Sequence, residues 1–287
     1  MEELGSDRVL VRGAKGLLPT DTYKVSATYL KGNRISIAVI IAGIKAAEKA
    51  QVSAEAIIKK TQRIFSENDW SNYIDKKISI IGTEVTYGDN ARPTQPREVL
   101  LRIIATHEQK DALTLLSREI AQASTGMTPG FTNMLGGRPS VSPSIRLFSF
   151  LLPKEQISTT VDIDDKQFEV ETYTSKLNHI DSISKASSLS DKLDTTDTEV
   201  ALIKLAYARS GDKGDHANIG VIARKPEYLP YIRDSLTPKR VAKYFSHVVK
   251  GEVERWDVPG IGALNFLLRN SLGGGGMASL NIDPQGK

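Results

Sequence analysis

The segment YKVSATYLKGNRISIAVII, residues 23–41, is followed directly by AGIKAAEKAQVSAEAIIKKTQRIF, residues 42–65. The first segment holds two apolar, β-branched runs, and Lys31-Gly32-Asn33 between them predicts a hairpin turn. In the second segment, apolar residues recur at spacings of three and four, which is typical of an amphipathic helix. These residues are Ala46, Ala47, Ala50, Ala54, Ile57, Ile58, Thr61 and Ile64. Strands that precede a packed helix predict an α+β fold, here a two-layer α/β sandwich block.

The rest of the N-terminal block, residues 1–157, extends this pattern. A second helix is expected at Lys110–Gln122 because Leu113, Leu116 and Ile120 share one face. Further strands are expected at Arg8–Val11, Ile78–Gly82, Glu98–His107 and Ser144–Leu152.

The C-terminal block, residues 200–287, has its own pattern. We expect strands at Val200–Arg209, Asn218–Arg224, Val253–Val258 and Met277–Ile282, and helices at Pro226–Ser235, Pro238–Val249 and Ile261–Leu272. Thr237 is the expected N-cap of the second helix, with Pro238 at its first helical position. The order of these elements resembles a small ferredoxin-like domain.

An acidic, Ser- and Thr-rich segment, residues 158–199, separates the two blocks. It holds ten acidic and four basic residues and few large apolar ones. Such a composition cannot bury enough surface to offset its ordering entropy. We therefore expect a solvated linker, with one edge strand at Phe168–Tyr173.

The composition excludes several classes of protein. The chain has 287 residues, 40% of them apolar, and no Cys, which excludes disulfides, a thiolate nucleophile and Cys-ligated metals. No apolar run is long enough to span a bilayer, and the N-terminus is no secretory signal, so we expect a cytoplasmic protein with no membrane contact. The net charge of +4 comes from scattered Lys and Arg without a stacking motif, so we expect no nucleic acid as partner.

The segment ARSGDKGDHANIGVIAR, residues 208–224, carries the strongest signal for function. Its glycines let backbone amides approach an anionic ligand. Lys213 would hold a carboxylate or phosphate, whereas Asp212 and Asp215 would ligate Mg²⁺ or one of them would act as a base. The alternative is a solvated hairpin, because Gly-Asp-Lys-Gly is good turn chemistry. The further candidates here are Arg209, His216 and Asn218.

Other loops offer weaker candidates for substrate binding. Residues 12–22, RGAKGLLPTDT, resemble a phosphate loop but lack the Walker spacing. Residues 82–97 follow a strand, where sites concentrate, and residues 125–143 form an apolar, glycine-bearing loop. Each of these three loops has a purely structural alternative, as a surface loop or a loop packed on the core. The glycines at 273–276 are expected first to end a helix and only secondarily to bind a ligand. The candidate residues in these loops are Lys15, Gly16, Asp21, Glu84, Asp89, Asn90, Arg138, Gly274 and Gly275.

The four His, at positions 107, 179, 216 and 247, show no zinc-binding spacing, and no GxSxG motif is present. His247 lies in an expected helix and is most simply a partly buried structural residue.

Five stretches together resemble the acyclic terpene utilisation family, the AtuA-like proteins. They are RGAKGLLPTDTYKVSATYL, GTEVTYGDNA, FTNMLGGRPSVSPSIRLFSFLLPK, YARSGDKGDHANIGVIAR and ALNFLLRNSLGGGGMASLNIDPQGK. The resemblance implies that residues 1–157 are the C-terminal part of the family's core domain and that residues 200–287 are its ferredoxin-like domain. Since family proteins are commonly about twice as long, it also implies that a second polypeptide could supply the missing N-terminal half.

The resemblance implies catabolism of branched acids carried as CoA thioesters. The leading hypothesis is an enzyme of hydratase, lyase or isomerase type that acts by proton transfer on a small-molecule acid or CoA thioester. Asp212 or Asp215 would be its base, Lys213 its enolate stabiliser and Arg209 the orienting residue. The alternative is a non-catalytic partner subunit of an acyl-CoA carboxylase or lyase, and in either case we expect a homo-oligomer.

Overall fold

The computed structural model describes residues 2–12, 16, 18–133, 136–172 and 198–287, and its mixture of helices and sheets confirms the α+β class. The chain divides into two compact units. The smaller unit comprises residues 1–27 and 148–185, and the larger comprises residues 28–147 and 186–287.

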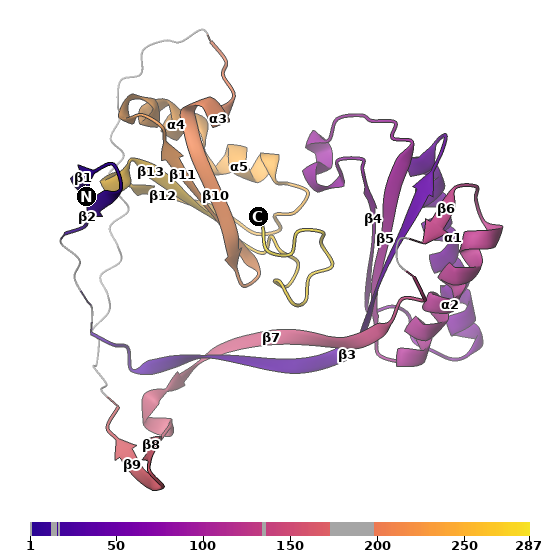
Figure 1. Ribbon diagram of the computed structural model, residues 1–287, viewed down its shortest axis with the longest axis horizontal. Coiled ribbons are helices and arrows are strands. Elements are labelled where there is room, and N and C mark those ends of the chain that lie inside the picture. Colours follow the sequence, from indigo (N-terminus) through magenta and orange to yellow (C-terminus); the bar gives the residue numbers. More distant parts are fainter. Residues whose placement is uncertain (1, 13–15, 17, 134–135, 173–197) are drawn as a thin grey trace. The chain divides into compact units, whose positions relative to one another are not determined.

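The larger unit contains a sheet with the strand order β4-β5-β3-β6, in which β7 also pairs with β3 (Figure 1). Its strands are β3 (Thr22–Ala42), β4 (Asp75–Ile81), β5 (Glu98–His107), β6 (Phe131–Asn133) and β7 (Val141–Pro153). The helices α1 (Ala46–Glu67) and α2 (Lys110–Gly126) contact β5 and cover one face of this sheet. The predicted strand at Glu98–His107 and both predicted helices are therefore confirmed.

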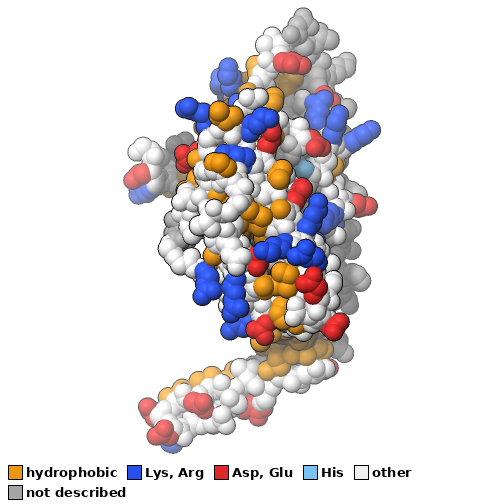
Figure 2. Space-filling model, turned by 90° about the vertical axis from the view of Figure 1, so that its right-hand side faces the viewer, with side chains coloured by type: hydrophobic (Ala, Val, Ile, Leu, Met, Phe, Trp, Pro, Cys, Tyr) orange, Lys and Arg blue, Asp and Glu red, His pale blue; other side chains and the backbone are white. Residues whose placement is uncertain are grey.

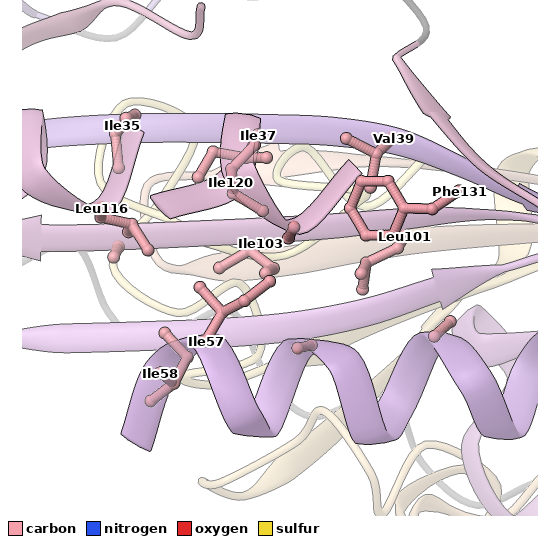
Figure 3. Packing of buried hydrophobic residues seen from close by; sticks show 14 of the residues in the cluster. Ile35, Ile37, Val39, Ile57, Ile58, Leu101, Ile103, Leu116, Ile120 and Phe131 are labelled. Atoms are coloured by element: carbon pink, nitrogen blue, oxygen red, sulfur yellow. The ribbon is translucent and has the colours of Figure 1, made fainter. Parts of the chain in front are cut away.

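The core lies between the sheet and these two helices. Successive residues of a strand point to opposite faces, so Ile35, Ile37 and Val39 of β3 face the helices (Figure 3). They pack with Leu101 and Ile103 of β5, and with Ile57, Ile58, Leu116 and Ile120 of the helices. Ile37, Leu101, Ile103 and Leu116 are fully buried.

The predicted turn at Lys31-Gly32-Asn33 is wrong, because β3 runs unbroken through it. Gly32 has a φ of 68°, and a Cβ there would lie 2.7 Å from the carbonyl oxygen of His107. Glycine is required here for close approach to the end of β5, not for chain reversal. The two apolar runs on either side are one strand.

The described part of the smaller unit contains two hairpins, β1 (Glu2–Gly5) with β2 (Arg8–Leu10), and β8 (Thr159–Ile163) with β9 (Lys166–Val170). The 3-10 helix η2 (Lys154–Gln156) lies before the second hairpin. Asp164 and Asp165 form the turn between β8 and β9, with φ values of 46° and 63°, the left-handed geometry that two-residue hairpins need. Residues 158–172 are therefore more ordered than a solvated linker, whereas residues 173–197 lie outside the described chain.

The C-terminal sheet has the order β10-β11-β13-β12 and is antiparallel throughout. Its strands are β10 (Ala206–Lys213), β11 (His216–Ala223), β12 (Val253–Val258) and β13 (Ala263–Leu268). The helical elements are α3 (Leu202–Leu205), η3 (Pro226–Tyr228), α4 (Leu229–Ser235), α5 (Pro238–Tyr244) and η4 (Pro259–Ile261). Ile232 of α4 and Val241 of α5 pack on one face of the sheet. The start of α5 is as predicted, since Thr237 Oγ1 accepts a hydrogen bond from the Arg240 amide.

Three predictions in this block need correction. Residues 261–272 form no helix, because β13 pairs with strands on both sides and buries Leu264, Phe266 and Leu268 by alternation. A short apolar run cannot be assigned to helix or strand by periodicity alone. Residues 277–282 form no strand, and the strand predicted from residue 200 begins only at Ala206, after α3.

Candidate functional site

The face of the first sheet that points away from α1 and α2 carries positive charge. Lys77 of β4, Arg102 of β5 and Arg34 of β3 alternate with the buried core residues and therefore project to this face. Arg146 of β7 lies beside Arg34 and lowers its pKa by repulsion. We call Arg146, Arg34, Arg102 and Lys77 the cationic row, because they lie on four successive strands.

The cationic row holds the C-terminal segment, residues 271–283. Arg34 donates from Nη1 to the carbonyl of Met277 (3.1 Å) and from Nη2 to that of Ser279 (2.9 Å). Arg102 donates to the carbonyl of Leu280 (3.0 Å), and Lys77 donates to Oδ1 of Asn281 (2.5 Å). The three bonds from Arg34 and Arg102 use backbone carbonyls that the predicted strand at 277–282 would have paired.

Burial and mutual repulsion disfavour the charges of the cationic row. Burial lowers the pKa of Arg34, and the charges of Arg102 and Arg146 lower it further. Burial likewise lowers the pKa of Lys77, as do the charges of Arg102 and Lys250, whereas the charge of Asp75 opposes this shift. The Nε of Arg146 is buried and has no hydrogen-bond partner among the described residues. Positive charge therefore exceeds negative charge around the row.

The C-terminal segment is also bound to the β10–β11 hairpin. Asp215 Oδ1 accepts a hydrogen bond from the amide of Gly274 (2.5 Å), and the Asp215 carbonyl accepts from the amides of Ser271 and Leu272 (2.9 and 3.2 Å). Gly275 has a φ of 82°, and a Cβ there would lie 2.9 Å from the carbonyl of Gly214. The two glycine-bearing motifs of the sequence are thus in direct contact.

A cavity of about 520 Å³ lies between β4, the 3-10 helix η1 (Val85–Asn90), the C-terminal sheet and the C-terminal segment. This volume is in the usual range for a small-molecule site. Lys77 projects into it, and Ser79, His247 and Asp283 also line it. Its apolar lining residues are Val85, Ile219, Phe245, Val248, Leu268, Leu272 and Ile282. A long apolar group with an acidic end would fit this lining.

His247 closes the cavity against η1. Its Nε2 lies 3.0 Å from the carbonyl of Thr86, which can only accept, so Nε2 carries the proton. Gly88 has a φ of 55°, and a Cβ there would lie 2.2 Å from Cγ of the imidazole. The ring therefore lies directly on the backbone of Gly88, which leaves Nδ1 shielded and without a partner in the described structure.

The structure separates the residues predicted on the β10–β11 hairpin. Asp212 pairs with Ala217 and shares its face with Ser210, and both of these neighbours line the cavity. Arg209 and Lys213 alternate to the opposite face, and both are exposed. Asp212 is exposed as well, at the margin of the cavity.

The remaining candidates on this hairpin have structural partners. Nδ1 of His216 accepts from the amide of Asn270 (2.9 Å), and Asn218 donates to Oδ1 of Asn265 (2.8 Å). The carboxylate of Asp215 is engaged by Gly274, as described above.

The predicted loop at residues 82–97 forms the η1 wall of the cavity. Glu84 pairs with Arg92, whose hydrogen bonds lower the pKa of the Glu84 carboxyl. Asn90 donates to the carbonyl of Tyr244 (2.9 Å) and so ties η1 to α5, whereas Asp89 is exposed.

The other candidates lie elsewhere. Arg138 is exposed in the larger unit. Gly16 and Asp21 belong to the smaller unit, where the Asp21 carbonyl accepts from the amide of Lys154. Lys15 lies outside the described residues.

Sequence reasoning missed the cationic row, although a signal was present. Arg102 stands within VLLRIIAT, where apolar residues flank it on both sides, and Arg34 directly precedes ISIAVII. A cation within an apolar run that predicts a buried strand must find hydrogen-bond partners on the face of the sheet to which it points.

The face on which α1 and α2 lie shows no comparable grouping of charge. Figure 2 views the molecule from the side on which α1 and α2 lie and shows Lys and Arg scattered among Asp and Glu. Within the described ranges, no three His, Asp or Glu residues are placed to hold a metal ion. No helix in this part of the chain is long and apolar enough to cross a bilayer.

Comparison with known proteins identifies two matches along the chain. Residues 1–163 match the family model of the acyclic terpene utilisation family protein AtuA, and residues 200–287 match that of the AtuA ferredoxin-like domain. No curated protein and no solved structure gives a significant match.

Proposed function

Because the chain belongs to the acyclic terpene utilisation family, we propose that its cavity binds a branched acid or the acyl group of its CoA thioester. The reaction is proton transfer, as in a hydratase, lyase or isomerase, and takes place in the cytoplasm. The observation that carries this proposal is the ammonium group of Lys77 in an otherwise largely apolar cavity.

Lys77 replaces Lys213 as the residue that holds the acid. In the described structure its ammonium group bonds an amide oxygen rather than a carboxylate, so it is available to a substrate oxyanion. Stabilising an enolate or carboxylate oxygen in a site that excludes water is worth far more than in solution. Apolar lining residues from β11, β13 and the C-terminal segment would contact the hydrocarbon part.

Asp212 is the proposed proton acceptor. Its place opposite Ala217 puts its carboxylate next to two residues that line the cavity, Ser210 and Ala217. His247 acts as a positioning residue, because its bond to Thr86 and its contact with Gly88 keep η1 closed on the cavity.

Deuterium exchange tests this proposal. A branched acyl thioester incubated with the protein in D₂O should gain deuterium at the carbon next to the thioester carbonyl, measured by mass spectrometry. Asp212→Asn should abolish the exchange while the melting temperature and thioester binding stay unchanged. Lys77→Gln should weaken binding, whereas Lys59→Gln, an exposed lysine of α1, should behave as wild type.

Absence of exchange with straight and branched thioesters alike would refute the proton-transfer reaction. Binding that is unaffected by Lys77→Gln would refute the assignment of the cavity.

A second function, as a partner subunit of an acyl-CoA carboxylase or lyase, is favoured by the apolar surface of β7. Phe148 and Phe150 alternate to the same face of β7, are 58% and 38% exposed, and stack with ring centroids 5.8 Å apart. Exposed apolar patches often mark interaction sites. A complex that co-purifies with the wild type but is lost in Phe148→Ser/Phe150→Ser would support this role, and light scattering would detect self-association.

A further inference from the structure

The cationic row has more positive charge than its partners in the structure balance. Its hydrogen-bond acceptors are the carbonyls of residues 277, 279 and 280 and the amide oxygen of Asn281, none of which carries a net charge. Within the described ranges, no hydrogen bond or ion pair joins any of the four side chains to a carboxylate. Partly buried cations with so little counter-charge are costly to maintain, although the charge of Asp75 offsets part of this cost at Lys77.

We infer that the arginines of the cationic row, Arg146 above all, form a binding site for the phosphate groups of the ligand whose acyl end meets Lys77 in the cavity. This inference rests on the proposed function, because the row begins at Lys77 inside that cavity. Arg146 lies three strands away, which corresponds to about 14 Å across a sheet. The arrangement suits a CoA thioester, in which a long, flexible arm separates the acyl group from the phosphates.

Charge and geometry favour phosphate over a second carboxylate. Several cations gathered along one line match a group with several negative charges better than a carboxylate with one. The planar guanidinium also forms paired hydrogen bonds with phosphate oxygens. The buried Nε of Arg146 supplies a donor that no residue of the described structure accepts.

The glycine loop packs closely against Arg146. Gly274 has a φ of 95°, and a Cβ there would lie 3.0 Å from Cβ of Ala278 and 3.4 Å from Nη1 of Arg146. Glycine therefore lets the backbone of this loop approach the guanidinium closely. Gly274 was predicted from the sequence as a substrate-binding residue, and its place beside Arg146 is consistent with that role.

Burial, and after it the repulsion between neighbouring cations, lowers the pKa of Arg34 and of Lys77, and an anion bound beside them would relieve both effects. A ligand that binds only the folded state raises the melting temperature. Because the partners are charged and partly exposed, binding should also weaken as salt rises.

Calorimetric titration of two thioesters of the same branched acid tests the inference. Acyl-CoA carries the phosphates, whereas acyl-pantetheine lacks them and keeps the acyl end. Wild type should bind acyl-CoA more tightly than acyl-pantetheine. Arg146→Gln should weaken acyl-CoA binding by about ten-fold or more, the usual effect of losing a charged hydrogen bond, without changing acyl-pantetheine binding. Arg146→Lys, which keeps the charge but loses the paired geometry, should fall between the two.

Arg118→Gln is the matched control. Arg118 is exposed on α2, which covers the opposite face of the same sheet, so this variant loses the same charge away from the row. It should bind acyl-CoA with the wild-type Kd. Inorganic pyrophosphate should compete with acyl-CoA and not with acyl-pantetheine.

Equal binding of the two thioesters by wild type, or an equal loss in Arg146→Gln and Arg118→Gln, would overturn the inference. Binding of pyrophosphate to the row without binding of acyl-CoA would overturn the assignment of the phosphates to CoA. In each of these cases, the proposed function survives if acyl-pantetheine still binds and Lys77→Gln weakens that binding. If neither thioester binds, both proposals fail.

Discussion

The two faces of the first sheet contrast although the same strands build both. The face under α1 and α2 is apolar and closed, with Ile37, Leu101 and Ile103 fully buried. The opposite face presents the cationic row, and the C-terminal segment covers it through hydrogen bonds rather than apolar packing. Arg102 and Ile103 are neighbours on β5, yet Arg102 bonds the C-terminal segment and Ile103 packs in the core. The first face forms the apolar core, whereas the second holds the C-terminal segment through charged side chains.

The largest expected effect is on the apolar face. Ile103→Ala removes buried methyl groups from a closely packed core, so we expect a loss of about 2–5 kcal/mol in the free energy of unfolding. Denaturant titration followed by circular dichroism would measure it. Val52→Ala, at a position of α1 that is 67% exposed, should change this free energy by less than about 0.5 kcal/mol. A small effect of Ile103→Ala would contradict the view that this face carries the stability.

Gly88→Ala should give the next largest effect, on the side of the cavity. A Cβ would overlap the His247 ring, and the backbone of Gly88, with a φ of 55° and a ψ of −128°, is one that other residues rarely adopt. We expect a loss of about 1–3 kcal/mol together with weaker ligand binding. Hydrogen exchange at residues 85–90 should rise.

Two further variants identify the cause of this loss. Gly211→Ala should cost less, because nothing lies within 4 Å of a Cβ at that position. If the overlap matters, Gly88→Ala should also cost less in a His247→Ala background. Equal costs in both backgrounds would leave backbone strain as the whole effect.

A smaller effect concerns pH and lies in the apolar core. Burial raises the pKa of Tyr73 to about 12, although its hydrogen bond with Thr61 (2.6 Å) opposes this shift. The unfolded chain ionises this phenol near its ordinary pKa of 10.0, whereas the folded chain ionises it only near 12. Ionisation between pH 10 and 12 therefore stabilises the unfolded state, and the free energy of unfolding falls as the pH rises. Tyr73→Phe should cost about 1 kcal/mol at neutral pH and make this alkaline loss less steep.

Thermal melts from pH 8 to about 12 would measure the slope. Tyr29→Phe, at an exposed position, is the control and should retain the wild-type slope. An unchanged slope in Tyr73→Phe would contradict the assignment of the alkaline loss to this phenol.

The contrast between the two faces of the first sheet also explains which parts of the structure the sequence could predict. The core-facing residues of α1 and of β5 follow from periodicity, because burial on one face imposes it. Helix was wrongly assigned at 261–272 because ALNFLL is a short run with apolar residues at nearly every position, so its sequence does not display the alternating burial that β13 has in the structure. The cavity depends on residues distant in sequence, such as Lys77, Thr86, His247 and Asn281, and no local pattern brings them together. The structure brings the hairpin and glycine motifs into direct contact, yet the alternation of β10 separates Asp212 from Lys213 and Arg209.

The smallest expected effect on the free energy of unfolding is on the charged face, and it tests the contrast between the two faces most directly. Arg146 makes no hydrogen bond through its buried Nε in the described structure and lies beside the like charge of Arg34. Arg146→Gln should therefore change the free energy of unfolding by less than about 0.5 kcal/mol in the absence of ligand. The same substitution should remove most of the rise in melting temperature that acyl-CoA produces in wild type. A loss of stability comparable to that of Ile103→Ala would show that Arg146 belongs to the packing of the fold, and the charged face would then be a second structural layer. A side chain whose role is to bind ligand should, like Arg146 here, leave the free energy of unfolding unchanged when it is substituted and strongly weaken acyl-CoA binding.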